Sequence, residues 1–264
     1  MKNKVVKQMH SLEQLTNSYY IAKTINALRA DGELDVMKFE DYELVENWSP
    51  KVRDELHEYW LHNVFPMVKE KIHILLILKV IFEDIEKYNL KEDSSITESS
   101  KDNEHLVKIA RNNDGFDLLK KINLEEHTLH VTSQMLTILR NIIDDDTDIL
   151  IISSLLHDFG KSTLIRKEIA PETMAKGTFF FKPHMEISGM YVDSILMPKI
   201  FKIVESNDSL KRYKRPLESI LKKISDFVIN HHETSKQWKN RNIKLREADT
   251  LAREKELLNL KIGN

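Results

Sequence analysis

Cysteine is absent from this 264-residue chain, and its absence excludes disulfides, cysteine-ligated zinc or iron–sulfur sites and thiol catalysis. Glycine and proline are scarce, with six of each, which disfavours an all-β fold because such folds need many turns. An excess of either charge is also missing. Lys and Arg number 40 against 42 Asp and Glu, so a globally basic nucleic-acid coat is excluded. The plentiful Leu, Ile, Lys and Glu favour helices.

Long apolar runs are missing as well. The most apolar stretch, residues 72–82, is interrupted by His73 and Lys79 and is shorter than the ~20 residues that cross a bilayer. The first eight residues lack the apolar core of a signal peptide. We therefore expect a soluble, cytoplasmic protein with no membrane partner.

The charges are unevenly distributed along the chain. Residues 31–58 hold ten acidic and three basic side chains, whereas residues 199–246 hold thirteen basic and five acidic ones, a local net charge of +8. Such runs are most often solvated faces, so the basic stretch matters to function only if it surrounds a site.

One segment reads as a linker. Residues 91–103 contain a single large apolar side chain, Ile96, and cannot bury enough surface to offset the entropy of ordering them. This composition predicts a flexible linker between an N-terminal helical region at residues 1–90 and a second domain at residues 104–264.

Local start signals predict the helices. Ser49 and Pro50 form a cap followed by proline, which predicts a helix to about residue 62. Residues 149–156 are apolar throughout and fit a buried strand or a buried helix. The lack of other strand-like segments favours the helix, capped by Thr147, and hence an all-α fold. Further helices are predicted over residues 5–29, 66–88, 124–140, 183–197, 216–231 and 243–260.

His157 and Asp158 directly follow the apolar run 149–156. A charged pair at the end of a buried segment must be compensated, and a divalent metal ion would compensate it. Imidazole and carboxylate suit zinc, manganese or iron, and a carboxylate can bridge two metals.

The run L-L-H-D-F-G-K at residues 155–161 resembles the signature of the HD superfamily of metal-dependent phosphohydrolases. Four further segments resemble the other motifs of that family and occur in the family order: E-H-T-L-H-V at 126–131, K-P-H-M-E-I-S-G at 182–189, N-H-H-E at 230–233 and R-E-A-D-T-L-A-R at 246–253. The resemblance covers residues 124–257, half of the chain, and implies an HD-domain helical bundle with an N-terminal helical extension.

The resemblance also implies a centre of two divalent transition metals (Mn, Fe, Zn or Ni) bridged by Asp158. The implied ligands of the first metal are His127, His157, Asp158 and Asp249, and those of the second are Asp158, His184, His231 and His232. His130 lies one turn after His127 and stays an alternative first ligand. Neighbouring residues on a helix point about 100° apart, so both His231 and His232 reach one metal only at a helix end. The alternative is that one of the two is exposed to solvent.

The implied activity is that of a metal-dependent phosphohydrolase or phosphodiesterase acting on a nucleotide or nucleic acid. Lys161, three residues after Asp158, would bind a phosphate oxygen, and its alternative is a solvated lysine. Three side chains of the basic stretch are predicted to bind substrate, because the motifs on both sides of them are implied metal ligands: Lys236, Lys239 and Arg241.

Two features point to other members of the superfamily. The Gly-Tyr-Pro of the cyclic-dinucleotide branch does not follow Glu233, which disfavours a cyclic di-GMP phosphodiesterase. Residues 124–131 and 248–254 also resemble, more loosely, the HD-type relaxases of conjugative elements, so a DNA nuclease or relaxase of a mobile element is one alternative. The other is a non-catalytic HD domain that serves as a binding or regulatory module. The intact ligand set argues against this last alternative.

Overall fold

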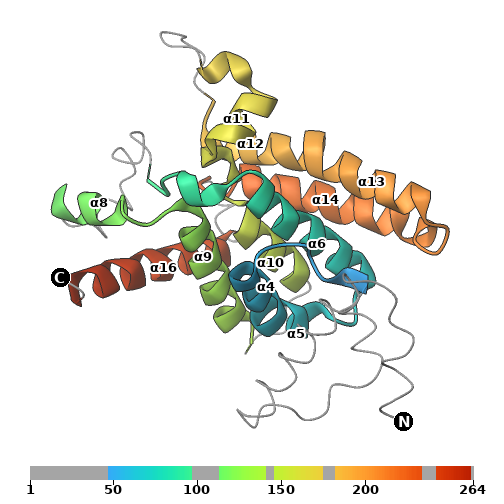
Figure 1. Ribbon diagram of the computed structural model, residues 1–264, viewed down its shortest axis with the longest axis horizontal. Helices are drawn as coiled ribbons and strands as arrows, with labels where there is room; N and C mark the ends of the chain where they lie inside the picture. Colours follow the sequence, from blue (N-terminus) through green and yellow to red (C-terminus); the bar gives the residue numbers. More distant parts are fainter. Residues whose placement is uncertain (1–46, 97–112, 141–145, 175–181, 234–241, 263–264) are drawn as a thin grey trace. The chain divides into compact units, whose positions relative to one another are not determined.

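The computed structural model describes residues 47–96, 113–140, 146–174, 182–233 and 242–262. It divides the chain into two compact units, residues 1–49 and residues 50–264, and the helices discussed below belong to the second (Figure 1). The described residues form helices and turns without a β-strand, so the predicted all-α fold is confirmed. The helix predicted over residues 5–29 lies outside the described residues.

The first helices of this unit are α4 (Asp54–Tyr59), α5 (Phe65–Val68) and α6 (Ile72–Lys87), with a wide turn joining α4 to α5. The predicted helix start at Pro50 is wrong by four residues. The amides of Lys51 and Arg53 donate to the side chains of Glu83 and Glu86 on α6, so the chain stays extended until Arg53. Tertiary acceptors thus override the local start signal.

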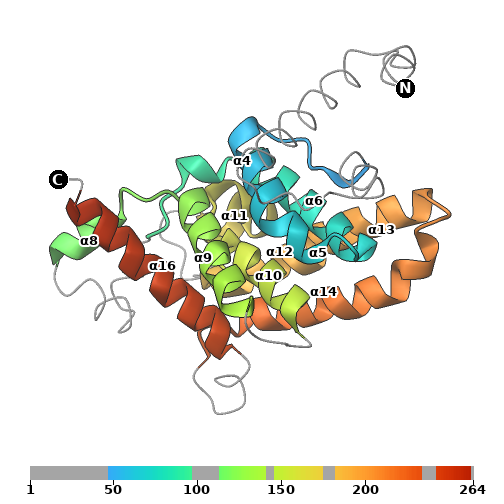
Figure 2. The ribbon, with the colours of Figure 1, turned by 90° about the horizontal axis from the view of Figure 1, so that it is seen from below.

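The centre of the unit is α10 (Thr147–Leu156), whose residues 149–156 are all buried. It packs against α9 (Leu124–Leu139), α14 (Lys214–Ile229) and α16 (Ile243–Ile262). A helix that is apolar on all sides must be covered on all sides, and these neighbours cover it. The choice of helix over strand for this run is therefore confirmed. The helix α16 also contacts α8 (Asn113–Leu119) and lies along α9 (Figure 2).

Helix α12 (His184–Tyr191) continues through a wide turn into α13 (Met197–Ser206), and α14 then returns alongside α13 and α12 (Figure 1). The sequence predicts a stop near Met197, before Pro198. The helical path continues because the Met197 amide donates to Val192, five residues back, in a turn wide enough to accommodate proline. The returning path brings the start of α12 and the end of α14 to the same place.

Residues 90–96, in the predicted linker and just before it, are ordered against the rest of the unit. Asp93 accepts a hydrogen bond from the amide of Leu124, and the amide of Ser95 donates to Ile122. Ser95 is fully buried, and Ile96 packs in a small apolar cluster with Phe116, Leu119 and Leu257.

The described part of the predicted linker therefore packs within the unit of residues 50–264, and the predicted division into two domains stays a prediction. Composition alone did not indicate the order of residues 93–96, which comes from backbone hydrogen bonds and one well-placed isoleucine. Residues 97–103 of the predicted linker lie outside the described residues. Among the helices that the structure does describe, none combines the length and the apolar character that crossing a membrane requires.

Candidate metal centre

Two helices end at one cluster of histidines. Helix α10 ends at Leu156 and α14 at Ile229, and the rings of His157 and His231 fold back onto the last turns of their own helices. The Nδ1 of His157 lies 2.9 Å from the carbonyl oxygen of Ser154, and the Nδ1 of His231 lies 2.6 Å from that of Val228. The last carbonyls of a helix have no following amide to bind, so these rings satisfy them. Because a carbonyl only accepts, both rings carry a proton on Nδ1, and in their neutral form they have a lone pair on Nε2.

A third ring, His127, comes from the first turn of α9 and is fully buried. The start of α9 is held by a capping box in which Asn123 and Glu126 bind each other's backbone amides. The Nδ1 of His127 lies 3.0 Å from a carboxylate oxygen of Glu256 on α16, so this ring also presents the lone pair of Nε2. That Nε2 lies 3.2 Å from Oδ1 of Asp249.

The Nε2 atoms of His127, His157 and His231 are buried and make no hydrogen bond to any described residue. A buried polar atom without a partner costs free energy, and a ligand bound at this cluster would relieve that cost at three atoms at once. The Nε2 atoms of His127 and His157 lie 3.6 and 3.4 Å from Oδ2 of Asp158. Ligand atoms ~2.1 Å from a shared zinc-like ion would lie roughly 3.0–3.4 Å apart. The donor set and its spacing therefore fit a metal ion.

Asp158 lies between two groups of histidines. Its Oδ2 faces His127 and His157, and its Oδ1 lies 3.2 Å from Nε2 of His184. Burial alone would raise the pKa of this carboxyl, but the ammonium of Lys161, 2.6 Å from Oδ2, and the neighbouring His157 hold the pKa well below its ordinary value. Asp158 is therefore ionised and offers one oxygen to each group.

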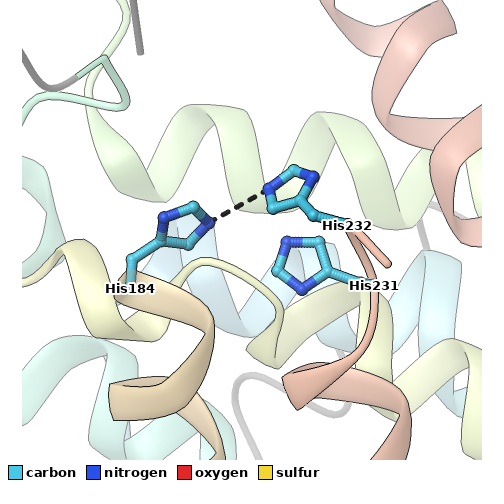
Figure 3. A group of neighbouring side chains, drawn as sticks. All are labelled: His184, His231 and His232. Atoms are coloured by element: carbon cyan, nitrogen blue, oxygen red, sulfur yellow. Dashed lines mark hydrogen bonds between the residues drawn. The ribbon is translucent and has the colours of Figure 1, made fainter. Parts of the chain in front are cut away.

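The second group consists of His184, His231 and His232 (Figure 3). The Nε2 atoms of His184 and His232 are 3.2 Å apart, and the rings of His231 and His232 have centroids 4.0 Å apart. Burial and then the neighbouring imidazoles lower the pKa of His231 well below 6.5 and that of His232 to about 4. All three rings are therefore neutral near neutral pH, which is the form that binds metals.

The geometry bears on two questions that the sequence left open: whether His231 and His232 can both reach one site, and whether His127 or His130 faces Asp158. Both His231 and His232 follow the end of α14 at Ile229, so neither lies on a regular helix and both rings reach His184. His130 is half-exposed, and its Nδ1 lies 3.0 Å from the same oxygen of Glu256 that binds His127. The group facing Asp158 therefore contains His127 and not His130.

Two glycines permit the close approach of α12. A Cβ atom on Gly160 would lie 1.9 Å from the carbonyl oxygen of His184, so only glycine fits there. The Gly160 amide donates to the hydroxyl of Ser188, which in turn donates to the carbonyl of His157. A Cβ on Gly189 would lie 2.2 Å from the side chain of Ile229 at the end of α14. These contacts fix the start of α12, and hence His184, beside Asp158.

Of the residues predicted to bind substrate, the structure describes Lys161 alone. Lys161 is buried, with its ammonium 2.6 Å from Asp158 and 3.0 Å from the carbonyl oxygen of Ser95, so it is not the solvated lysine of the alternative. Phosphate binding by Lys161 stays a prediction. Lys236, Lys239 and Arg241 lie outside the described residues. Within the described part of the basic stretch, at least five lysines have an acidic partner, which reduces its effective charge: Lys199, Lys211, Lys214, Lys222 and Lys223.

The sequence analysis missed three residues of this centre: Ser95, Arg253 and Glu256. Glu256 follows Asp249 by seven residues, or two helical turns, so the helical period would have placed both on one face of α16. Ser95 carries no such signal, because its contacts lie far away in the chain.

Comparison of the chain with protein-family models, curated proteins and solved structures gave no match.

Proposed function

We propose that this protein is a metal-dependent phosphohydrolase or phosphodiesterase of the HD type, acting on a nucleotide or nucleic acid through a two-metal centre. The observation that carries the proposal is Asp158, whose two carboxylate oxygens face two different groups of histidines. The resemblance of five segments to the HD motifs, in the family order, supports the same proposal.

The chain's own residues would hold both ions. His127, His157, Asp158 and Asp249 would bind the first ion, and Asp158 with the second group of histidines would bind the other. The fixed Nδ1 protons keep the Nε2 lone pairs directed inward, and Lys161 keeps Asp158 ionised and oriented. Bound there, two metals supply an activated water and neutralise the charge that develops on the phosphoryl oxygens.

A phosphate ester would reach the centre on the side of Asp249 and His184. Their side chains are 29% and 17% exposed, whereas those of His127, His157 and Asp158 are at most 3% exposed. The partly exposed carboxylate of Asp249 and imidazole of His184 leave room for a substrate. The buried side chains of the other ligands would hold the ions in place.

Metal analysis of the purified protein tests the centre. We expect two divalent ions per chain. Asp158→Ala removes both ions, His184→Ala mainly removes the second, and His130→Ala, the matched control from the same helix, removes neither. At most one ion per chain, even after reconstitution with manganese or iron, contradicts the proposal.

A panel of phosphoesters tests the activity: nucleotides, cyclic nucleotides, single-stranded DNA, duplex DNA and RNA. We expect hydrolysis by the metal-loaded protein, its loss in Asp158→Ala and its retention in His130→Ala. A fully loaded protein that hydrolyses none of them would instead favour the non-catalytic binding module.

Salt dependence separates a polymeric substrate from a small one. Binding to single strands weakens with a log–log slope of roughly −0.7 per phosphate contact. If nucleic acid is the substrate, replacing Lys236, Lys239 and Arg241 together by Ala flattens that slope and leaves the metal content unchanged. Undetectable DNA and RNA binding at low salt, together with hydrolysis of a nucleotide, would exclude the nuclease and relaxase alternatives.

A further inference from the structure

Glu256 on α16 is a fully buried carboxylate that binds three side chains. Its Oε1 lies 3.0 Å from Nδ1 of both His127 and His130, and its Oε2 lies 3.0 Å from Nη1 of Arg253. Each of these nitrogens donates, because an ionised carboxylate only accepts. Both oxygens of Glu256 are therefore used within the protein.

Arg253 is itself held in place. It is buried, and its guanidinium donates to Ser95 through Nη1, 2.9 Å from the hydroxyl, and through Nη2, 3.1 Å from the carbonyl oxygen. The same carbonyl of Ser95 accepts from Lys161, which binds Asp158. The two buried carboxylates, Asp158 and Glu256, thus each have one cation, and both cations are anchored on one residue.

His127 needs this carboxylate because of its place in α9. His157 and His231 follow the ends of their helices, where free carbonyls accept their Nδ1 protons. His127 lies in the first turn of α9, and the free backbone groups of a first turn are amides, which donate. Only an acceptor from another element can fix its Nδ1 proton, and Glu256 is that acceptor.

We propose that Glu256 is a positioning residue: it fixes the proton on Nδ1 of His127 and so directs the Nε2 lone pair at the first metal site. The inference rests on the proposed metal centre. Glu256 lies on the opposite edge of the ring from Nε2 and is not itself a ligand. Partners of this kind orient a metal-binding histidine and raise its basicity, and their loss costs roughly 10–100-fold in metal affinity.

A Co²⁺ titration tests this role. The full chain is first stripped of metal with a chelator, and binding is followed by the visible absorption of the bound ion. The wild-type protein binds two Co²⁺ ions. Glu256→Gln weakens one of the two binding steps by roughly 10–100-fold and leaves the other unchanged. Glu256→Asp, which keeps the charge on a shorter side chain, weakens the same step less. Glu254→Gln, which alters an exposed glutamate of the same helix, changes neither step.

The outcomes separate this role from a structural one and from failure of the centre itself. Equal weakening of both steps, or unchanged affinity in Glu256→Gln, overturns the positioning role while leaving the metal centre standing. A wild-type protein that binds no Co²⁺ overturns the centre and this inference with it. If circular dichroism shows that Glu256→Gln does not fold, Glu256→Asp is used in its place. Unchanged affinity of Glu256→Asp at both binding steps then counts against the positioning role.

Discussion

At the scale of single residues, Gly160 sets how near the second histidine group lies to Asp158. A side chain there would meet backbone atoms of α12, namely the carbonyl oxygen of His184 at 1.9 Å and the amide of Ser188 at 2.8 Å. Backbone cannot rotate away as a side chain does, so α12 would have to move. The same position therefore affects both packing and the geometry of the site.

We expect Gly160→Ala to lower the free energy of unfolding by at least the ~1–3 kcal/mol typical of overpacking and to reduce binding of the second ion more than the first. Urea unfolding and metal content measure the two effects. Gly189→Ala is the comparison, because its added atom meets side-chain atoms of Ile229 rather than backbone, and a side chain can shift more readily, so the substitution should cost less. Equal stability and metal content in Gly160→Ala and wild type would contradict the close approach.

Much of the residue-level site was predictable from local motifs. Six residues of the site lie within the short motifs of the sequence analysis, and the structure brings them together: His157, Asp158, His184, His231, His232 and Asp249. The motif resemblance favoured His127 over His130, but the helical period could not decide between them, since both lie near one face of α9. It depends on which ring faces Asp249, a residue more than a hundred positions away.

At the scale of elements, α6 is joined to the α12–α13 segment by an ion pair between a buried carboxylate and a lysine that is partly exposed. Asp84 is buried, Lys199 lies 2.7 Å from its Oδ2, and the hydroxyl of Tyr191 donates to the same oxygen at 2.5 Å. Burial and this carboxylate raise the pKa of Tyr191 well above 10, so Tyr191 stays a hydrogen-bond donor. The arrangement connects the N-terminal helices of this unit to the segment that carries His184.

Asp84→Ala removes the acceptor of both partners and leaves the buried phenol of Tyr191 without it. We expect a loss of about 1–3 kcal/mol in the free energy of unfolding, the usual cost of leaving a buried hydrogen-bonding group unsatisfied. Urea denaturation measures it. Lys214→Ala, which breaks an exposed pair with Glu205, should change stability much less, because exposed ion pairs contribute little. A similar small loss in Asp84→Ala would show that the pair contributes little.

Helices were predictable where their boundaries depend on neighbouring residues and not where distant groups compete. The sequence places α9, α10 and α16 within two residues of their observed ends. It misplaces the start of α4, because Glu83 and Glu86 of α6 take the amides that a helix start at Pro50 would use. Such competition depends on tertiary structure and leaves no local pattern.

At the scale of the whole molecule, the buried imidazoles link stability to pH. Burial lowers the pKa of His184, His231 and His232 below the ordinary 6.5, and that of His232 to about 4. Between pH 6.5 and about 4 the unfolded chain therefore binds protons that the folded, metal-free chain does not, and stability falls as the pH falls. Burial lowers the pKa of His57 and His73 as well, whereas His157, whose pKa is raised by Asp158 and Asp249 against the effect of burial, opposes this trend as one group against five.

We expect the urea midpoint of the metal-free protein to be lower at pH 5 than at pH 7. His232→Gln should reduce the difference, because it removes one of the five groups. A midpoint at pH 5 that equals or exceeds the value at pH 7 would contradict the assignment of these rings as neutral and buried.

The positions of Ser95 and α16 in the chain also set the order in which the residues of the two histidine groups become available during synthesis. Ser95 is 66 residues from Lys161 and 158 residues from Arg253, and such distant contacts form late in folding because long loops must close first. Chains emerge from the ribosome with the N-terminal end first, so the second histidine group is complete once residue 232 has emerged. The first group must wait for α16, which brings Asp249, Arg253 and Glu256. The nascent chain therefore completes the second histidine group while the residues of α16 near Asp158 and His127 are still missing.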